Sequence, residues 1–281
     1  MWTEHRFISW DKTPIFYRRR AADAPKAVVI MVHGMGEHGG RYHHVAEYFA
    51  AAGLESILPD IRGFGRSGGP RTSLRSFSDL HQDLGALHSY VARTHRPIPI
   101  FLMGHSFGGL LVASYLAFSP QAPSRGLVLS SPCFGIAIQV SALKTFFAVA
   151  ISYLFPNYRE PDRIDPRLLT HDSRLLSIYE KDSLVDHRIS VSLYRELVLM
   201  PKKKFEIAKR LKLPVLIEQA GEDFIVSTEE TRRFYEALSS PDKQKDIYDG
   251  FYHEILNETG RSKVLARMTG WMLEKANSNA L

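Results

Sequence analysis

The chain has 281 residues, of which 44% are hydrophobic and 23% charged, with a formal net charge of +6. This composition excludes a disordered or fibrous protein and suffices for one large domain, or for one domain with an inserted subdomain. The single cysteine, Cys133, excludes an intrachain disulfide and is expected to be a small buried residue.

The positive charge concentrates in two short runs, residues 18–20 and residues 202–204. We expect both runs on solvated surface, with attraction to anionic lipid head groups as the alternative. No nucleic-acid-binding motif accompanies them, so no nucleic acid partner is expected. The N-terminal residues show no apolar stretch typical of a signal peptide, and a lone cysteine suits a reducing compartment. We therefore expect a cytoplasmic protein, with peripheral contact to a membrane as an option.

Strand and helix patterns alternate along most of the chain. Residues 6–10 and 14–18 predict a hairpin, and the β-branched run at residues 27–32 predicts a strand buried on both faces. The other expected strands are residues 54–59, 98–103, 126–130, 215–219 and 244–248, and the expected helices are residues 42–50, 77–94 and 109–116. Such alternation predicts an α/β fold with a mostly parallel central sheet flanked by helices.

The alternation breaks between about Cys133 and Phe205, where several helical patterns and no convincing strand occur. Because this stretch is too long for a plain loop, we expect a helical cap at residues 133–205, inserted into a core of residues 1–132 and 206–281. Within it, residues 136–155 are mostly apolar, but Lys144 and Gln139 are costly in lipid. We therefore favour a cap helix that lines an apolar pocket and also suits contact with a membrane interface.

Ser106 lies at a predicted junction of strand and helix, within Gly104-His105-Ser106-Phe107-Gly108. A serine between glycines at such a junction is typical of the nucleophile elbow, in which a strained turn presents the hydroxyl at the end of a sheet. Ser106 is therefore the candidate nucleophile. The alternative is a glycine-rich turn whose serine only caps the following helix.

A serine nucleophile needs a base, and the base needs a carboxylate to orient it. Asp223 and His253 each follow a predicted strand, so both are expected at the carboxyl edge of the sheet, near Ser106. Their chain order, serine then acid then histidine, is that of the hydrolase fold. His253 is expected to open a helical segment.

The alternatives to this pair are few. The chain has twelve histidines, but apart from His253 only His171 and His187 follow Ser106, and both fall within the predicted cap. Glu222 is the nearest rival to Asp223, whose alternative role is that of a turn or helix-capping acid. Glu254 is adjacent to His253 and is expected to point away from the site.

Acyl transfer also needs amide donors for the developing oxyanion. One donor is expected to be the backbone N–H of Phe107, directly after the nucleophile. We assign the other to Met35, in the glycine-rich loop that follows the first buried parallel strand. The alternative is a flexible turn with no role in binding; the glycine spacing matches neither a phosphate loop nor a dinucleotide fingerprint.

Five segments, in order along most of the chain, resemble those of monoacylglycerol lipase and lysophospholipase-like α/β-hydrolases. They are His33-Gly34-Met35-Gly36-Glu37-His38 with Arg41-Tyr42, the loop Asp60-Ile61-Arg62-Gly63-Phe64-Gly65-Arg66-Ser67, the elbow Gly104 to Gly109, Gly221-Glu222-Asp223 with Val226, and Tyr252-His253-Glu254-Ile255-Leu256-Asn257-Glu258. Phe107 stands where that family more often has Met. The resemblance implies the α/β-hydrolase fold and a serine hydrolase acting on fatty acyl esters.

Monoacylglycerols are the expected substrates, and lysophospholipids or short- and medium-chain carboxylic esters are the alternatives. A carbon–carbon hydrolase using the same three residues also remains open, as does a non-enzymatic ligand receptor or scaffold of this fold. No metal or cofactor is expected, because the chain has neither a Cys/His cluster with zinc spacing nor a His-Glu-x-x-His motif.

Overall fold

The computed structural model describes residues 1–137 and 141–278. Its centre is an eight-stranded sheet in the order β1-β2-β4-β3-β5-β6-β9-β10. The pairs β1–β2 and β2–β4 are antiparallel, and the other neighbours are parallel. The strands are β1 (Trp2–Ile8), β2 (Pro14–Arg20), β3 (Ala27–Val32), β4 (Leu54–Pro59), β5 (Ile100–His105), β6 (Gly126–Ser130), β9 (Val215–Ala220) and β10 (Lys243–Tyr248). The mostly parallel α/β sheet expected from the sequence is confirmed.

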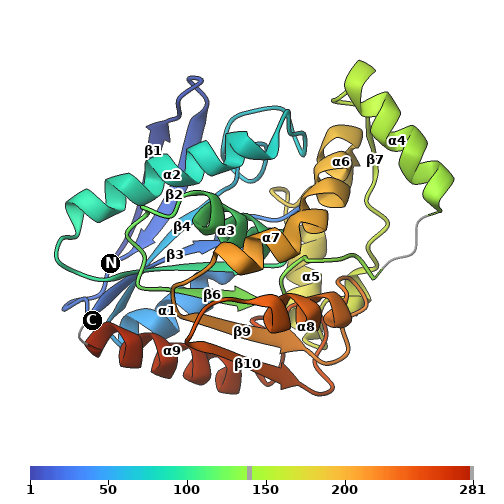
Figure 1. Ribbon diagram of the computed structural model, residues 1–281. Helices are drawn as coiled ribbons and strands as arrows, with labels where there is room; N and C mark the ends of the chain where they lie inside the picture. The colour runs from blue at the N-terminus through green and yellow to red at the C-terminus, as the bar shows by residue number, and fades with distance from the viewer. Residues whose placement is uncertain (138–140, 279–281) are drawn as a thin grey trace.

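Helices cover both faces of this sheet (Figure 1). Along β3, Val28, Ile30 and Val32 pack into one apolar cluster, while the alternate residues pack into another. This period of two places a core on each face. The first cluster is covered by α2 (Phe77–Thr94), α3 (Phe107–Phe118), α7 (Lys204–Arg210) and α8 (Thr228–Ala237), and the second by α1 (His43–Ala51) and α9 (Arg261–Asn277).

Most predicted elements lie within a few residues of the observed ones, and two differences affect the site. Strand β5 begins at Ile100 rather than at residue 98 and extends to His105, so it ends immediately before Ser106. The expectation that His253 opens a helix is wrong, because α9 begins only at Arg261. Side chains hold the intervening loop instead: the Glu258 carboxylate accepts the backbone N–H of Tyr252 at 3.0 Å. His253 therefore lies in a loop that the Glu258 carboxylate holds in place.

We refer to residues 133–205 as the cap; in Figure 1 its elements gather at one end of the sheet, away from both termini. Two three-residue strands pair antiparallel within it, so the expectation of no strand there is wrong. These strands are too short to leave a periodic pattern. The cap elements are α4 (Ala142–Leu154), β7 (Arg159–Pro161), η2 (Pro166–Leu168), α5 (Ser173–Lys181), β8 (Arg188–Ser190), α6 (Val191–Leu199) and η3 (Met200–Lys203).

Helix α4 is shorter than predicted, because it begins at Ala142 rather than at residue 136. Ile136 instead forms an isolated bridge with Val226, and Gln139 lies outside the described residues. No helix among residues 1–137 and 141–278 is long and apolar enough to cross a membrane.

Candidate active site

Ser106 occupies a strained turn between β5 and α3. Its φ of 53° and ψ of −117° are unusual for a residue with a side chain. A Cβ on Gly104 would lie 2.3 Å from the Gly108 carbonyl oxygen, and one on Gly108 would lie 2.3 Å from the His33 carbonyl oxygen. Only glycine fits at either position. The backbone N–H of Ser106 donates to the Ser130 carbonyl at 2.9 Å, which ties the turn to β6.

His253 and Asp223 come together across the adjoining loops. His253 Nδ1 lies 2.8 Å from Asp223 Oδ2, and both side chains are almost fully buried. The other carboxylate oxygen accepts the backbone N–H groups of Ile225 and Val226 at 3.0 and 2.9 Å. Gln219 Nε2 donates to Asp223 Oδ2 at 3.3 Å. These contacts fix the carboxylate in one orientation toward the imidazole.

Mutual stabilisation shifts both groups toward their charged forms. Burial lowers the pKa of His253, but the Asp223 carboxylate reverses this and raises it above the usual value of 6.5. Burial raises the pKa of Asp223, but His253 and the backbone donors bring it below its ordinary value. Asp223 is therefore ionised near neutral pH. An imidazolium formed at His253 has a compensating charge beside it.

Ser106 and His253 line one pocket beneath the cap. Within the described ranges no hydrogen bond joins the Ser106 hydroxyl to His253, and such bonds are often long before substrate binds. The lining is mostly apolar, with cap residues on one side and core residues on the other. The cap contributes Cys133, Ile136, Asp162, Ile164, Leu169, Tyr179, Ile189, Tyr194 and Leu197.

The loop of residues 33–41, which we call the oxyanion loop, forms part of the pocket wall. The Gly34 N–H donates to Glu37 Oε1 at 2.6 Å, so this amide is already used. The Met35 N–H, by contrast, has no acceptor among the residues that the structure describes. Phe107 is the first residue of α3, so its N–H is one of the amides that an α-helix leaves without an internal partner. Both residues predicted to supply oxyanion donors thus line the pocket.

Sequence reasoning missed a buried ion cluster in the pocket wall. Arg41 donates to both oxygens of Glu254 at 2.7 and 2.8 Å and to Glu37 at 2.6 Å. Glu254 lines the pocket, so the expectation that it points away from the site is wrong; its carboxylate binds Arg41 and anchors the histidine loop to the oxyanion loop. Burial raises the pKa of Glu37, but Arg41 lowers it to about 2. Glu37 and Arg41 were visible in the sequence only as members of the loop motif.

Three of the other candidates, Glu222, His171 and His187, lie outside the pocket lining. Glu222, the rival acid, is exposed. His171 contacts Glu258 and His187 packs against Tyr179, and neither lines the pocket. Cys133 is buried, as expected, and burial raises the pKa of its thiol to about 12. The thiol is therefore not the nucleophile at neutral pH.

Residues 23–260 match the family described as "Serine aminopeptidase, S33". The chain belongs to this α/β-hydrolase family. It is 32% identical to the monoacylglycerol lipase of Mycolicibacterium smegmatis, over 96% of this chain and 97% of that protein. It is 30% identical to phospholipase YtpA of Bacillus subtilis, over 86% of this chain and 93% of that protein.

The fold agrees with this membership. The crystal structure of Paleococcus ferrophilus monoacylglycerol lipase superposes with a TM-score of 0.85 at 27% identity, covering 93% of this chain and 99% of that one. The α/β-hydrolase fold with a mostly parallel sheet and flanking helices is thus confirmed. The chain is an ester hydrolase of this family.

The close backbone approach at the elbow predicts that a side chain at position 108 would lower the stability of the fold. Gly108→Ala would drive a methyl group into the His33 and Val32 carbonyls, so we expect a loss of about 3 kcal/mol and a clearly lower Tm. Gly270→Ala is the matched control, because no atom lies within 4 Å of the place that a Cβ would take there. Gly270 is exposed in α9, and alanine there should add about 0.5–1 kcal/mol. Scanning calorimetry measures both; equal Tm values for the two variants would contradict the packing argument.

Proposed function

We propose that this chain hydrolyses fatty acyl esters, monoacylglycerols foremost, through a Ser106–His253–Asp223 triad and an acyl-enzyme. His253 takes the proton of the Ser106 hydroxyl, which attacks the ester carbonyl. The Met35 and Phe107 amides stabilise the oxyanion. The alcohol leaves with the proton from His253, and a water molecule, activated in the same way, releases the fatty acid. Asp223 orients His253 and balances its charge.

The observation that carries this proposal is the buried His253–Asp223 pair, 2.8 Å apart, on the wall of the pocket that contains the strained Ser106. A scaffold or receptor has no need of an oriented imidazole beside a strained serine. Strain of this kind is retained where it presents a reacting group.

The substrate assignment rests on the pocket lining and the relatives. Aliphatic and aromatic side chains from the cap, residues 133–205, suit an acyl chain, because apolar burial is their main contribution to binding. The proteins that this chain resembles include a monoacylglycerol lipase and a phospholipase. Hydrolysis of lysophospholipids is therefore the second candidate.

We also propose that the cap rests on a lipid surface through α4. Leu143, Phe146, Phe147 and Leu154 each expose more than half of their side chains to solvent on this helix. An apolar surface of this kind is typical of a membrane or protein contact. The basic run at residues 18–20 does not contribute to it, since each arginine pairs with an acidic residue and Arg18 is buried.

A fluorophosphonate probe tests the nucleophile. We expect it to label the wild-type protein and to leave Ser106→Ala unlabelled, because the probe reacts with activated serines. Ser114→Ala, which removes a buried hydroxyl from α3, should label normally. Equal labelling of Ser106→Ala would exclude the mechanism.

The pH dependence of ester hydrolysis tests the base. The value of kcat/KM should fall as the pH is lowered through a midpoint above 6.5, because only neutral His253 accepts the proton and its pKa is raised.

A substrate panel tests the acyl specificity. Esters from acetyl to long-chain monoacylglycerols should show rising kcat/KM, because each methylene buried in the pocket contributes about 0.8 kcal/mol, or roughly fourfold. Lysophosphatidylcholine distinguishes the phospholipase alternative, and an aminoacyl anilide controls for the peptidase named in the family description. An optimum at two or four carbons would exclude the lipid assignment and leave the esterase intact.

Phosphatidylcholine vesicles test the membrane contact. Replacing Phe146 and Phe147 together by serine should weaken vesicle binding at least tenfold, because each buried phenyl contributes about 1.5–3 kcal/mol. Hydrolysis of a dispersed short-chain ester should be unchanged. Tyr48→Ser is the control, since Tyr48 is an exposed aromatic residue on α1 of the core. Unaltered sedimentation of the double variant with vesicles would exclude α4 as the contact.

A further inference from the structure

The oxyanion loop is held from two sides, and one of them is the cap. Asp186, which precedes β8, donates its backbone N–H to the Gly36 carbonyl at 2.8 Å. Asp182, at the end of α5, places Oδ2 2.8 Å from His38 Nε2. Gly36 has a φ of +78°, and a Cβ there would lie 3.0 Å from the Asp186 carbonyl oxygen. The cap backbone therefore lies directly against the loop.

His38 is a rigid link in this contact. Its Nδ1 accepts the Gly40 N–H at 3.1 Å, so the ring proton is on Nε2 and is donated to Asp182. Asp182 Oδ1 in turn accepts the Leu184 N–H at 2.9 Å, which fixes the carboxylate within its own turn. The His38 ring and the Asp182 carboxylate are therefore each held by a second hydrogen bond, so the end of α5 has little room to move relative to the turn at Gly39–Tyr42.

The core holds the other side of the same loop. Within the loop, Glu37 accepts the Gly34 N–H at 2.6 Å, and it also accepts the hydroxyl of Tyr42, a core residue, at 2.5 Å. Gly39 donates its N–H to Asp60 Oδ1 at 2.9 Å. Met35 thus lies between Gly34, which the core fixes, and Gly36, which the cap fixes.

We propose that Asp182 is a positioning residue: together with the Asp186 backbone it holds the Gly36 side of Met35, while His33 Nδ1 holds the Gly34 carbonyl on the other side at 2.7 Å, so that the docked cap completes the oxyanion hole. The inference rests on the proposed role of Met35 as an oxyanion donor. A donor must lie about 2.7–3.1 Å from the oxyanion to act, so a small rotation of one peptide is enough to weaken it. The cap therefore contributes to the chemical step in addition to enclosing the acyl chain.

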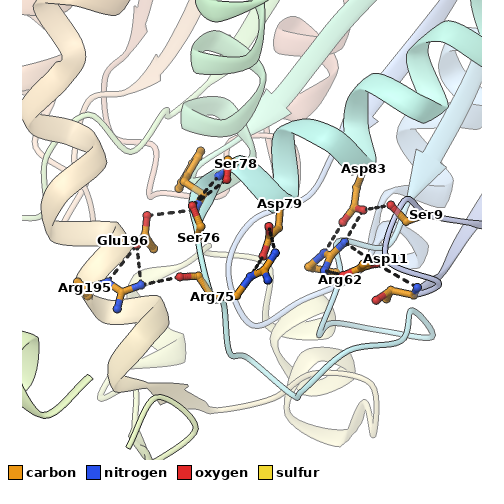
Figure 2. Close-up of polar contacts among 12 residues, drawn as sticks. Ser9, Asp11, Arg62, Arg75, Ser76, Ser78, Asp79, Asp83, Arg195 and Glu196 are labelled. Carbon is orange, nitrogen blue, oxygen red and sulfur yellow. Dashed lines mark hydrogen bonds and ion pairs between the residues drawn. The ribbon is translucent and has the colours of Figure 1, made fainter. Parts of the chain in front are cut away.

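The test compares two ways of loosening the cap. Asp182→Ala removes the side-chain contact with His38 of the oxyanion loop and leaves the backbone bond from Asp186 to Gly36 in place. Glu196→Ala removes a different contact between cap and core, in which the Glu196 carboxylate accepts the Phe77 N–H at 3.2 Å. The neighbouring bond from Arg195 to the Arg75 carbonyl is also drawn in Figure 2. Glu196 makes no hydrogen bond to residues 33–41 in the described parts of the chain, so it is the matched control.

The substrate is a water-soluble butyrate ester, and the second ligand is a trifluoromethyl ketone whose adduct with Ser106 carries an oxyanion. For Asp182→Ala we expect kcat to fall roughly tenfold to a hundredfold, part of the 10²–10³-fold loss of a whole donor, with KM within about twofold. The inhibition constant for the ketone should rise by the same factor as kcat falls. Glu196→Ala should leave both within about twofold of wild type.

A double-mutant cycle isolates the pair. His38→Ala should resemble Asp182→Ala, and the double variant should be no worse than the worse single variant, because both remove one link. An equal loss in Glu196→Ala, or a fall in kcat without weaker ketone binding, would overturn the inference. If the ketone forms no adduct with wild-type Ser106, the proposed function fails instead, so the two failures are distinguishable.

Discussion

The contact on which the site depends is the passage of the elbow against the end of β3. The carbonyl oxygens of Val32 and His33 occupy the space that a Cβ on Gly108 would need. The turn that carries Ser106 and the start of the oxyanion loop therefore approach each other closely through their backbones. His33 reinforces this junction: its Nδ1 donates to the Gly34 carbonyl at 2.7 Å, and its Nε2 accepts the Ile61 N–H at 2.9 Å. Burial lowers the pKa of His33, which keeps this ring neutral and able to accept.

Around this junction the protein buries charge in pairs and clusters. Glu37, Arg41 and Glu254 line the same pocket as His253, and Arg41 also stacks over Tyr179 of the cap at 4.5 Å. Burying three charges is costly, and a well-packed apolar cluster is often as stable. What this cluster provides is geometry: one guanidinium fixes the oxyanion loop, the histidine loop and a cap helix relative to one another. Its excess negative charge adds to that of Asp223 in favouring the charged form of His253.

The sheet could be predicted from the sequence, and so could the proximity of Ser106, Asp223 and His253. Each of these residues follows a parallel strand, and the carboxyl ends of such strands meet at one edge of the sheet. The sequence did not reveal the Arg41–Glu254 pair, since 213 residues separate the partners and no local pattern links them. The cap strands were missed because three residues carry no period. The helix expected at His253 was wrong because Glu258 holds that backbone in a loop, a tertiary contact that overrides local preference. The contact between Asp182 and His38 likewise depends on how the cap docks.

The position of the cap in the chain also bears on the order in which the molecule is assembled. Strand β6 ends at Ser130 and pairs in parallel with β9, which begins at Val215, so the whole cap is synthesised between two neighbouring strands. Until then β6 is an open edge, and distant parallel pairing is slow and prone to aggregation. Asp223 and His253 follow β9, whereas Ser106 precedes β6. A growing chain on the ribosome therefore carries its proposed nucleophile long before its proposed base, and the proposed triad is complete only when the last two strands join the sheet.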